Sequence, residues 1–143
     1  KGNLAPDGAI VFGEHFDAAI GRFDPGRATD GRCLELDAGG RNPCISEIVD
    51  RGIDLARDFL HSIAFAPDGR LWFTEHGPEE GETAASLGFV TADWRDVVRL
   101  PPLALYPGNG NAAAAGLAVD PSSGDLWFCE FWRRRIGRLQ RVD

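Results

Sequence analysis

Three segments of the chain repeat one pattern, and this repetition constrains the fold more than any other feature of the sequence. The segments are APDGAIVFGEHFDAAIGRF from Ala5, APDGRLWFTEHGPEEGETAASLGFV from Ala66 and VDPSSGDLWFCEFWRRRIGRL from Val119. Each has a turn with Asp and Gly, an apolar and aromatic run that ends in Glu, a variable loop and a second apolar run. Repeats spaced about 50–60 residues apart are typical of β-propellers, in which each blade is a four-stranded antiparallel sheet.

The residues of each repeat favour strands. Asp-Gly between two apolar runs indicates a tight hairpin, because Gly tolerates positive φ and Asp hydrogen-bonds its own backbone. The runs HSIAF and RLWFTE on either side of such a turn are short and rich in β-branched and aromatic residues. Eighteen glycines and nine prolines in 143 residues leave little room for long helices. We therefore predict an all-β fold made of antiparallel propeller blades.

The repeats also predict the organisation of the chain. Named from the channel outward, the strands of the three blades are expected to run b-c-d, a-b-c-d and a-b-c. About three blades cannot close a ring of the usual four to eight. Either the chain is part of a larger propeller or the remaining blades come from another copy, and we favour the first. Residues 1–143 form one propeller segment in this interpretation, with repeats at about 1–37, 61–107 and 114–143 and an insertion at 38–60.

Charge and hydropathy exclude several kinds of partner. The formal net charge of -7 argues against nucleic acid and anionic membranes, because phosphate contacts need a surplus of Lys and Arg. No apolar stretch approaches the ~20 residues needed to cross a bilayer, so we expect no membrane span. The partners we expect are a small-molecule ligand or a protein at the channel mouth. The compartment stays unknown, with a periplasmic or extracellular location preferred.

The cysteines and the insertion carry three further expectations. Cys33 and Cys44 bracket a Gly-rich loop, DAGGRNPC, that can bend back and allow a disulfide. Cys129 lies inside the run LWFCE, where we expect a small core residue. Trp72 and Trp127 occupy matched positions and are expected to pack between blades. The apolar residues of 42–60 are expected to form a short helix or an irregular flap.

His61 and Glu75 lie at the two ends of the hairpin in the second repeat. With Asp68 and Gly69 at the centre of a two-residue turn, the ladder places Ser62 opposite Glu75 and His61 within one register step. A histidine exchanges protons near neutral pH, and a carboxylate beside it can orient it or bind a cation. The pair therefore predicts an acid–base or metal site at one mouth of the channel, with His61 as the candidate catalytic residue.

Glu14, Glu75 and Glu130 recur at one position of the repeat, so three carboxylates are expected around the same mouth. Their oxygens suit Mg²⁺ or Ca²⁺, which makes them candidate metal ligands. A residue present in every repeat also has a structural interpretation, as a cap of backbone groups at a strand end, and we favour it for Glu14 and Glu130. His61 does not repeat, because its position in the third repeat is Ala115, and function usually lies at such non-repeating polar residues.

The runs HSIAFAPDGRLWFTE and GLAVDPSSGDLWFCEFWRRRIGRL resemble the blade repeat of the virginiamycin B lyase (streptogramin lyase) family of β-propellers. The recurrent phrase of that family is close to G-I-x-x-x-P-D-G-x-L-W-F-T-E followed by I-G-R. The resemblance implies a seven-bladed propeller that opens a cyclic depsipeptide by Mg²⁺-dependent elimination. It also implies that His61, fourteen residues before Glu75, is the general base near the metal. The family has a metal-binding Glu two residues before that His, where this sequence has Phe59.

Two main functions are therefore expected. The first is a metal-dependent carbon–oxygen lyase acting on a cyclic ester or a similar small molecule, with Mg²⁺ or Ca²⁺ as cofactor. The second is a non-catalytic propeller that serves as a binding or interaction domain of a larger extracytoplasmic protein. A gluconolactonase-like hydrolase is a third interpretation, but it needs Glu, Asn and Asp ligands from several blades that the three repeats do not clearly supply. The propeller fold alone does not select among these activities.

Overall fold

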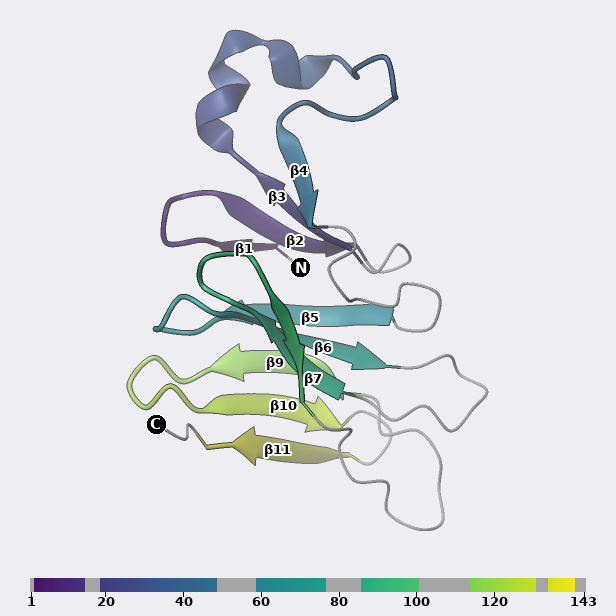
Figure 1. Cartoon of the computed structure of the whole chain (residues 1–143). Coiled ribbons are helices and arrows are strands. Elements are labelled where there is room, and N and C mark those ends of the chain that lie inside the picture. Colours follow the sequence, from purple (N-terminus) through teal and green to yellow (C-terminus); the bar gives the residue numbers. More distant parts are fainter. Residues whose placement is uncertain are drawn as a thin grey trace.

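The computed structural model describes residues 2–14, 19–48, 59–76, 86–100, 114–130 and 134–140, which form three antiparallel sheets (Figure 1). The first sheet has the order β1 (Gly2–Leu4), β2 (Ile10–Glu14), β3 (Ala19–Phe23) and β4 (Ile45–Ile48). The second has the order β5 (Phe59–Phe65), β6 (Leu71–His76), β7 (Ser86–Val90) and β8 (Val97–Arg99). The third consists of β9 (Ala114–Val119), β10 (Leu126–Glu130) and β11 (Arg135–Leu139), with β10 in the middle. The all-β prediction is confirmed. In the described segments no helix is long and apolar enough to span a membrane.

The first sheet differs from the expected strand order at both ends. It begins with the short strand β1, which pairs with β2, so its first strand is present where the sequence indicated none. It ends with β4, whose residues 45–48 pair with β3. The sequence predicts a short helix or flap for these residues. They instead form the last strand of the sheet, with Ile45 paired to Phe23 in the ladder. Residues 49–58 of the expected insertion and 101–107 of the second repeat lie outside the described residues.

The hairpin turn of the second sheet has three residues rather than two. The N–H of Gly69 donates to the carbonyl of Ala66, and the N–H of Ala66 donates to the carbonyl of Arg70, each at 2.9 Å. Pro67 presets the φ of the first turn position, and Gly69 has a φ of 86°. The turn is therefore a type I turn followed by a glycine in the left-handed conformation, a common three-residue hairpin.

This turn shifts the ladder by one residue from the register that we expected. Phe65 pairs with Leu71, and Ser62 pairs with Thr74 rather than with Glu75. The expected register was wrong because proline is favoured at the first central position of a type I turn. Pro67 occupies that position, so the turn begins one residue earlier than we expected.

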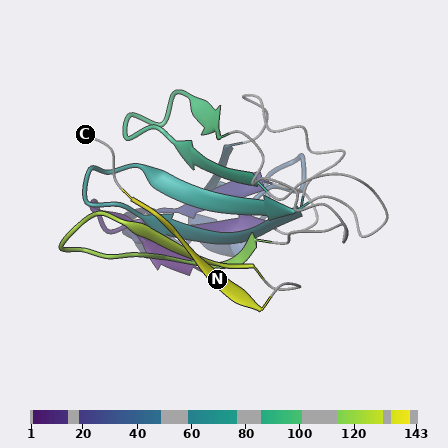
Figure 2. The same ribbon diagram turned by 90° about the horizontal axis from the view of Figure 1, so that it is seen from below.

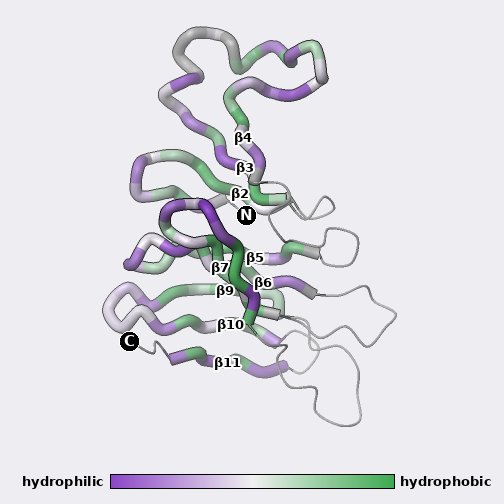
Figure 3. The backbone as a smooth tube through the Cα atoms, in the orientation of Figure 1, coloured by the Kyte–Doolittle hydropathy of each residue, from purple (hydrophilic) through white to green (hydrophobic). Residues whose placement is uncertain are grey.

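The three sheets stack face to face, and an apolar core fills each of the two spaces between them. Figure 3 shows the apolar positions concentrated in the strands, with more polar residues in the turns. The core between the first and second sheets consists of Ala5, Ala9, Val11, Ile20, Leu60, Ile63, Leu71, Phe73 and Val90. The core between the second and third consists of Ala66, Trp72, Leu87, Ala114, Leu126 and Phe128. Trp72 is therefore between sheets as predicted, whereas Trp127 is exposed.

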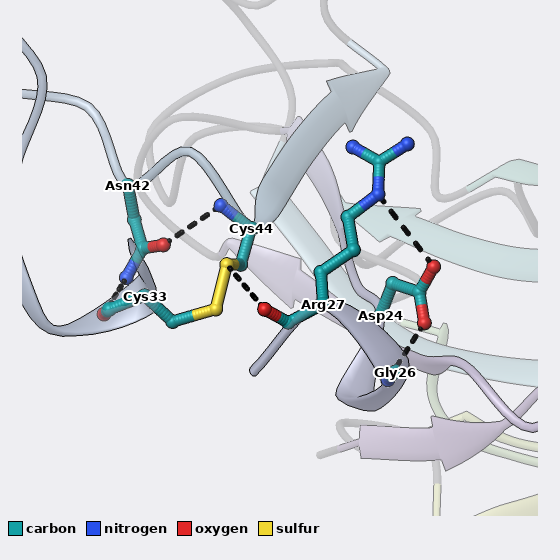
Figure 4. The surroundings of a disulfide bond; sticks show 6 residues. All are labelled: Asp24, Gly26, Arg27, Cys33, Asn42 and Cys44. Atoms are coloured by element: carbon teal, nitrogen blue, oxygen red, sulfur yellow. Dashed lines mark hydrogen bonds and ion pairs between the residues drawn. A yellow bond between two sulfur atoms is a disulfide. The ribbon is translucent and has the colours of Figure 1, made fainter. Parts of the chain in front are cut away.

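A disulfide-linked excursion joins β3 to β4 and projects from the top of the molecule in Figure 1. It contains two short 3-10 helices, η1 (Pro25–Asp30) and η2 (Arg32–Leu34), and the Asp24 carboxylate caps the first by accepting from the N–H of Gly26. Cys33 and Cys44, the pair that the sequence singled out, are bonded to each other (Figure 4). Asn42 braces the bridge, since its side chain donates to the carbonyl of Cys33 and accepts from the N–H of Cys44.

Candidate functional site

Glu75 is the next-to-last residue of β6 and is almost completely buried, with 1% of its surface exposed. Its carboxylate is held by Arg99 of β8, which reaches it from the far side of β7. Nε of Arg99 donates to Oε2 at 2.9 Å, and Nη2 donates to Oε1 at 3.1 Å. Two parallel bonds from one guanidinium match the geometry of a carboxylate, so the pair is a charge-assisted fork. Its positive partner compensates the charge of Glu75 inside the protein.

His61 is the extra residue of a β-bulge in β5. Leu60 pairs with Glu75 and Ser62 pairs with Thr74, so no residue of β6 lies opposite His61. The side chain of His61 is exposed, whereas its neighbours on both sides are buried. A bulge of this kind redirects one side chain out of the ladder. His61 and Glu75 are therefore within one register step of each other, but one faces solvent and the other lies in the interior.

The bulge is a feature of the repeat. The ladder of the third sheet shifts at the same place, between Phe128 and Glu130, and Ala115 occupies the position that His61 has in the second sheet. Thr74 connects the two bulges: its hydroxyl accepts from the N–H of Ser62 at 3.1 Å and donates to the carbonyl of Ala115 at 3.3 Å. The backbone around His61 is thus held by the neighbouring sheet, and the residue at this position of the bulge is a histidine in the second sheet and an alanine in the third.

The three repeated glutamates lie at the same end of their hairpins. Glu14 pairs with Ala19 and Glu130 pairs with Arg135 in the ladders that correspond to that of Glu75. The structure describes Glu14 by its backbone alone, and Glu130 is partly exposed. Among the described residues no three His, Cys, Asp or Glu side chains are grouped so that they could hold a metal ion. The proposed metal-ligand roles of these glutamates stay predictions.

A pocket of about 220 Å³ opens between the second and third sheets. It lies at the turn ends of β5 and β6, which are the opposite ends from His61 and Glu75. Most of its wall is apolar and is formed by Trp72, Phe89, Leu100, Leu126 and Leu139, with Arg70 on one side.

Arg70 belongs to the polar part of the pocket wall, together with Asp68 and Gln140. Its guanidinium carbon lies 5.5 Å from the ring centroid of Trp72 and 5.0 Å from that of Phe89. Asp68 in the turn accepts from Nε of Arg70 at 2.7 Å and thereby fixes the guanidinium. Cation–π contacts of this type stabilise the arrangement of rings and cation.

The pocket was not predicted from the sequence, although the repeat contains an indication of it. In the first and third sheets the matching arginine comes from the second apolar run: Arg22 pairs with Asp7, and Arg138 pairs with Asp125. In the second sheet that position is Phe89, and the arginine is instead Arg70, the residue that follows the turn. The exchange replaces a charged side chain by an aromatic ring on the face that the pocket opens onto.

Hydrogen bonds in the turns lower the pKa of three aspartates. The pKa of Asp120 falls from 3.8 to about 2, chiefly because the Ser122 hydroxyl and N–H donate to its carboxylate. The pKa of Asp7 is lowered mainly by the N–H of Ala9. The pKa of Asp93 is lowered mainly by the hydroxyl of Thr91. All three are at turns, and the Arg22 guanidinium contributes to the lowered pKa of Asp7 as well, so these shifts reflect turn hydrogen bonds and a surface ion pair.

Comparison of the chain with family models, with curated proteins and with solved structures finds no match.

Proposed function

We propose that the chain is a non-catalytic binding module of propeller type, which takes a small apolar group into the pocket between its second and third sheets. The observation that carries this proposal is the pairing of Glu75 with Arg99. Mg²⁺ and Ca²⁺ are bound through carboxylate oxygens, and both oxygens of Glu75 accept from a guanidinium that already balances their charge. Glu75 therefore does not fit the role of a metal ligand while Arg99 is in place.

The pocket supports the choice of ligand. Ligand sites in proteins are mostly apolar concavities with a few placed polar groups, and this pocket has aromatic and leucine walls with Arg70 on one side. Its volume of about 220 Å³ suits a single ring or a branched aliphatic group. Since Asp68 already pairs with Arg70, the recognition is expected to depend on apolar contact and ring stacking rather than on a charge in the ligand.

Toluene is a suitable probe for this pocket, with NMR chemical shifts as the readout. Toluene should shift the indole N–H signal of Trp72 and the backbone signals of residues that line the pocket. Leu100→Trp should fill the space and abolish these shifts, whereas Val98→Leu, two residues earlier and outside the pocket lining, should leave them unchanged. Shifts that persist in Leu100→Trp, or the absence of any shift in the unmodified chain, would overturn the assignment.

A second candidate is the lyase implied by the resemblance, and the bulge at His61 is the observation that favours it. The bulge presents a histidine to solvent one register step from a carboxylate, where the third sheet has only Ala115. In this candidate His61 would abstract a proton from a cyclic ester substrate. The test is elimination of a cyclic depsipeptide by the chain, with His61→Ala as the inactive variant. Activity that survives in His61→Ala would exclude this role for the histidine.

The disulfide bears on location under either function. Disulfides persist mainly in oxidising compartments, so the bond between Cys33 and Cys44 supports our preference for a periplasmic or extracellular protein.

A further inference from the structure

Within the stack, the apolar face of one sheet is covered by the next sheet at two interfaces. On the first sheet Val11 and Ile20 are buried, and β5 of the second sheet lies against β1 and β2. On the second sheet Trp72 and Leu87 occupy the same repeat positions and are buried, and β9 of the third sheet lies against β5 and β6. In both cases the apolar face is covered by the first strand of the next sheet.

The third sheet carries the same apolar positions without a cover. Trp127 and Ile136 correspond to Trp72 and Leu87, and they are 41% and 72% exposed. Cys129 pairs with Ile136 in the ladder and is also exposed, although we had predicted a core residue. Figure 2 views the stack from this side, with the third sheet nearest the viewer. No described residue covers this surface, which we call the open face of the third sheet.

Side chains on the open face of the third sheet are held by defined contacts. Arg138 lies over the ring of Trp127, with its guanidinium carbon 5.4 Å from the centroid, and donates to Asp125 at the turn. The same combination of turn aspartate, arginine and tryptophan stands at the covered face of the second sheet. The third sheet is thus already shaped as a surface onto which another sheet can pack.

The first sheet carries exposed apolar residues on the face that points away from the second sheet. Leu4 and Ile10 are paired in the ladder and are 71% and 40% exposed. The matching pair of the second sheet is Phe65 and Leu71, which packs into the core against the preceding sheet. The first sheet therefore exposes the surface by which each later sheet rests on the one before it, and we call this surface the open face of the first sheet.

We propose that the open face of the third sheet binds the open face of the first sheet in a second copy of this chain. This contact repeats the packing found twice within the chain, because each partner presents the positions that are buried at the two inner interfaces. Contiguous exposed apolar patches are typical of interaction surfaces. The contact is heterologous, so successive copies add head to tail until a ring closes or a filament grows. The proposal is independent of the pocket and of any metal.

Two substitutions block the two faces separately. Ile136→Lys places a charge on the open face of the third sheet, and Leu4→Lys places one on the open face of the first. The unmodified chain should show a native mass above its 15.5 kDa by light scattering, rising with concentration. Each variant alone should stay monomeric, because only one kind of face is left, and should have an unchanged melting temperature. Val98→Lys, on an exposed strand position away from both faces, is the matched control and should associate as the unmodified chain does.

The decisive step is to mix the two variants. Ile136→Lys keeps a working first sheet and Leu4→Lys keeps a working third sheet, so each should be monomeric alone and their mixture should give a one-to-one dimer. A chain that is monomeric at all concentrations would overturn the proposal. So would a mixture that stays monomeric, since the two intact faces would then not bind each other, and a variant that dimerises alone would show that the contact joins like faces.

Cys129 provides a readout that needs no substitution. In the unmodified chain its labelling by a maleimide should slow as the concentration of protein rises, because the partner covers the open face of the third sheet. A labelling rate constant that is independent of protein concentration would contradict the proposal even if a variant failed to fold.

Discussion

The carboxylate of Glu75 and the guanidinium of Arg99 form a two-bond fork across the intervening strand β7, with distances of 2.9 and 3.1 Å. Their side chains are 2% and 29% exposed, so the acid lies in the interior and the base closes it off from solvent. This relationship joins the end of the repeated apolar run to the outermost strand of the second sheet. It gives the repeated glutamate of this sheet a structural function.

Removing Arg99 alone should destabilise the fold strongly. Arg99→Met leaves Glu75 buried without its compensating charge, and the loss of one partner of such a pair costs about 3 kcal/mol or more of unfolding free energy. Urea unfolding followed by tryptophan fluorescence measures the change. The double variant Glu75→Met with Arg99→Met should recover most of the loss, because an apolar pair of similar volume needs no compensation. Equal destabilisation in the single and double variants would show that the charge of Glu75 is not what Arg99 stabilises.

Gly88 should not tolerate a side chain. A Cβ at this position would lie 2.4 Å from Cζ of Phe73 and 2.9 Å from the backbone oxygen of Val98. Since the ring of Phe73 is buried and cannot move freely, Gly88→Ala should cost about 1–3 kcal/mol by forcing the core apart. Gly116→Ala is the control, because its Cβ would meet only the sulfur of Cys129 at 3.3 Å and the carbon behind it. Similar melting temperatures for the two variants would contradict this account.

The disulfide should contribute to stability by restricting the unfolded chain. Cys33 and Cys44 are 11 residues apart, and closing a loop of this order contributes about 3 kcal/mol in the chain-entropy estimate. The double variant Cys33→Ser with Cys44→Ser should therefore lower the urea midpoint, and adding a reductant should lower that of the unmodified chain to the same value. Cys129→Ser is the control and should respond to reductant as the unmodified chain does. If reductant has no effect on the midpoint, the bond is not formed in solution.

Asp120 should contribute a pH-dependent term at acid pH. Its pKa is about 2 in the folded chain and 3.8 in the reference state, so the ionised form is favoured by folding. The contribution is therefore present above pH 3.8 and is lost as the pH falls through about 2. The difference in unfolding free energy between the unmodified chain and Asp120→Asn should narrow over this range. Glu35→Gln, at an exposed position, is the control, and a difference for Asp120→Asn that does not change with pH would contradict the assignment.

Much of the fold was predictable because the repeat encodes local structure. Asp-Gly turns, apolar runs and their spacing predicted the hairpins, and the hairpins dictate three sheets. The register was not predictable from Asp68 and Gly69 alone, because Pro67 selects a longer turn. The strand β4 was missed because only four residues form it and its pairing with β3 spans the excursion that the disulfide closes.

The site was less predictable than the fold. The proximity of His61 and Glu75 follows from their positions in the hairpin, but the bulge that turns them to different environments depends on Thr74 and on the neighbouring sheet. Arg99 was missed because it is 24 residues from Glu75 and on a strand that does not pair with β6. The sequence did contain an indication of this pairing. A glutamate at the end of a buried run needs a partner, and Arg99 is the cation in an otherwise apolar strand.

Calorimetric titration of Mg²⁺ into the unmodified chain tests the central claim most directly. If Arg99 satisfies Glu75 as the structure has it, the titration should give no saturable heat, and Mg²⁺ or a chelator should leave the melting temperature unchanged. Ca²⁺ should behave in the same way. Saturable binding of either cation that Glu75→Gln abolishes would contradict the account and would favour the lyase.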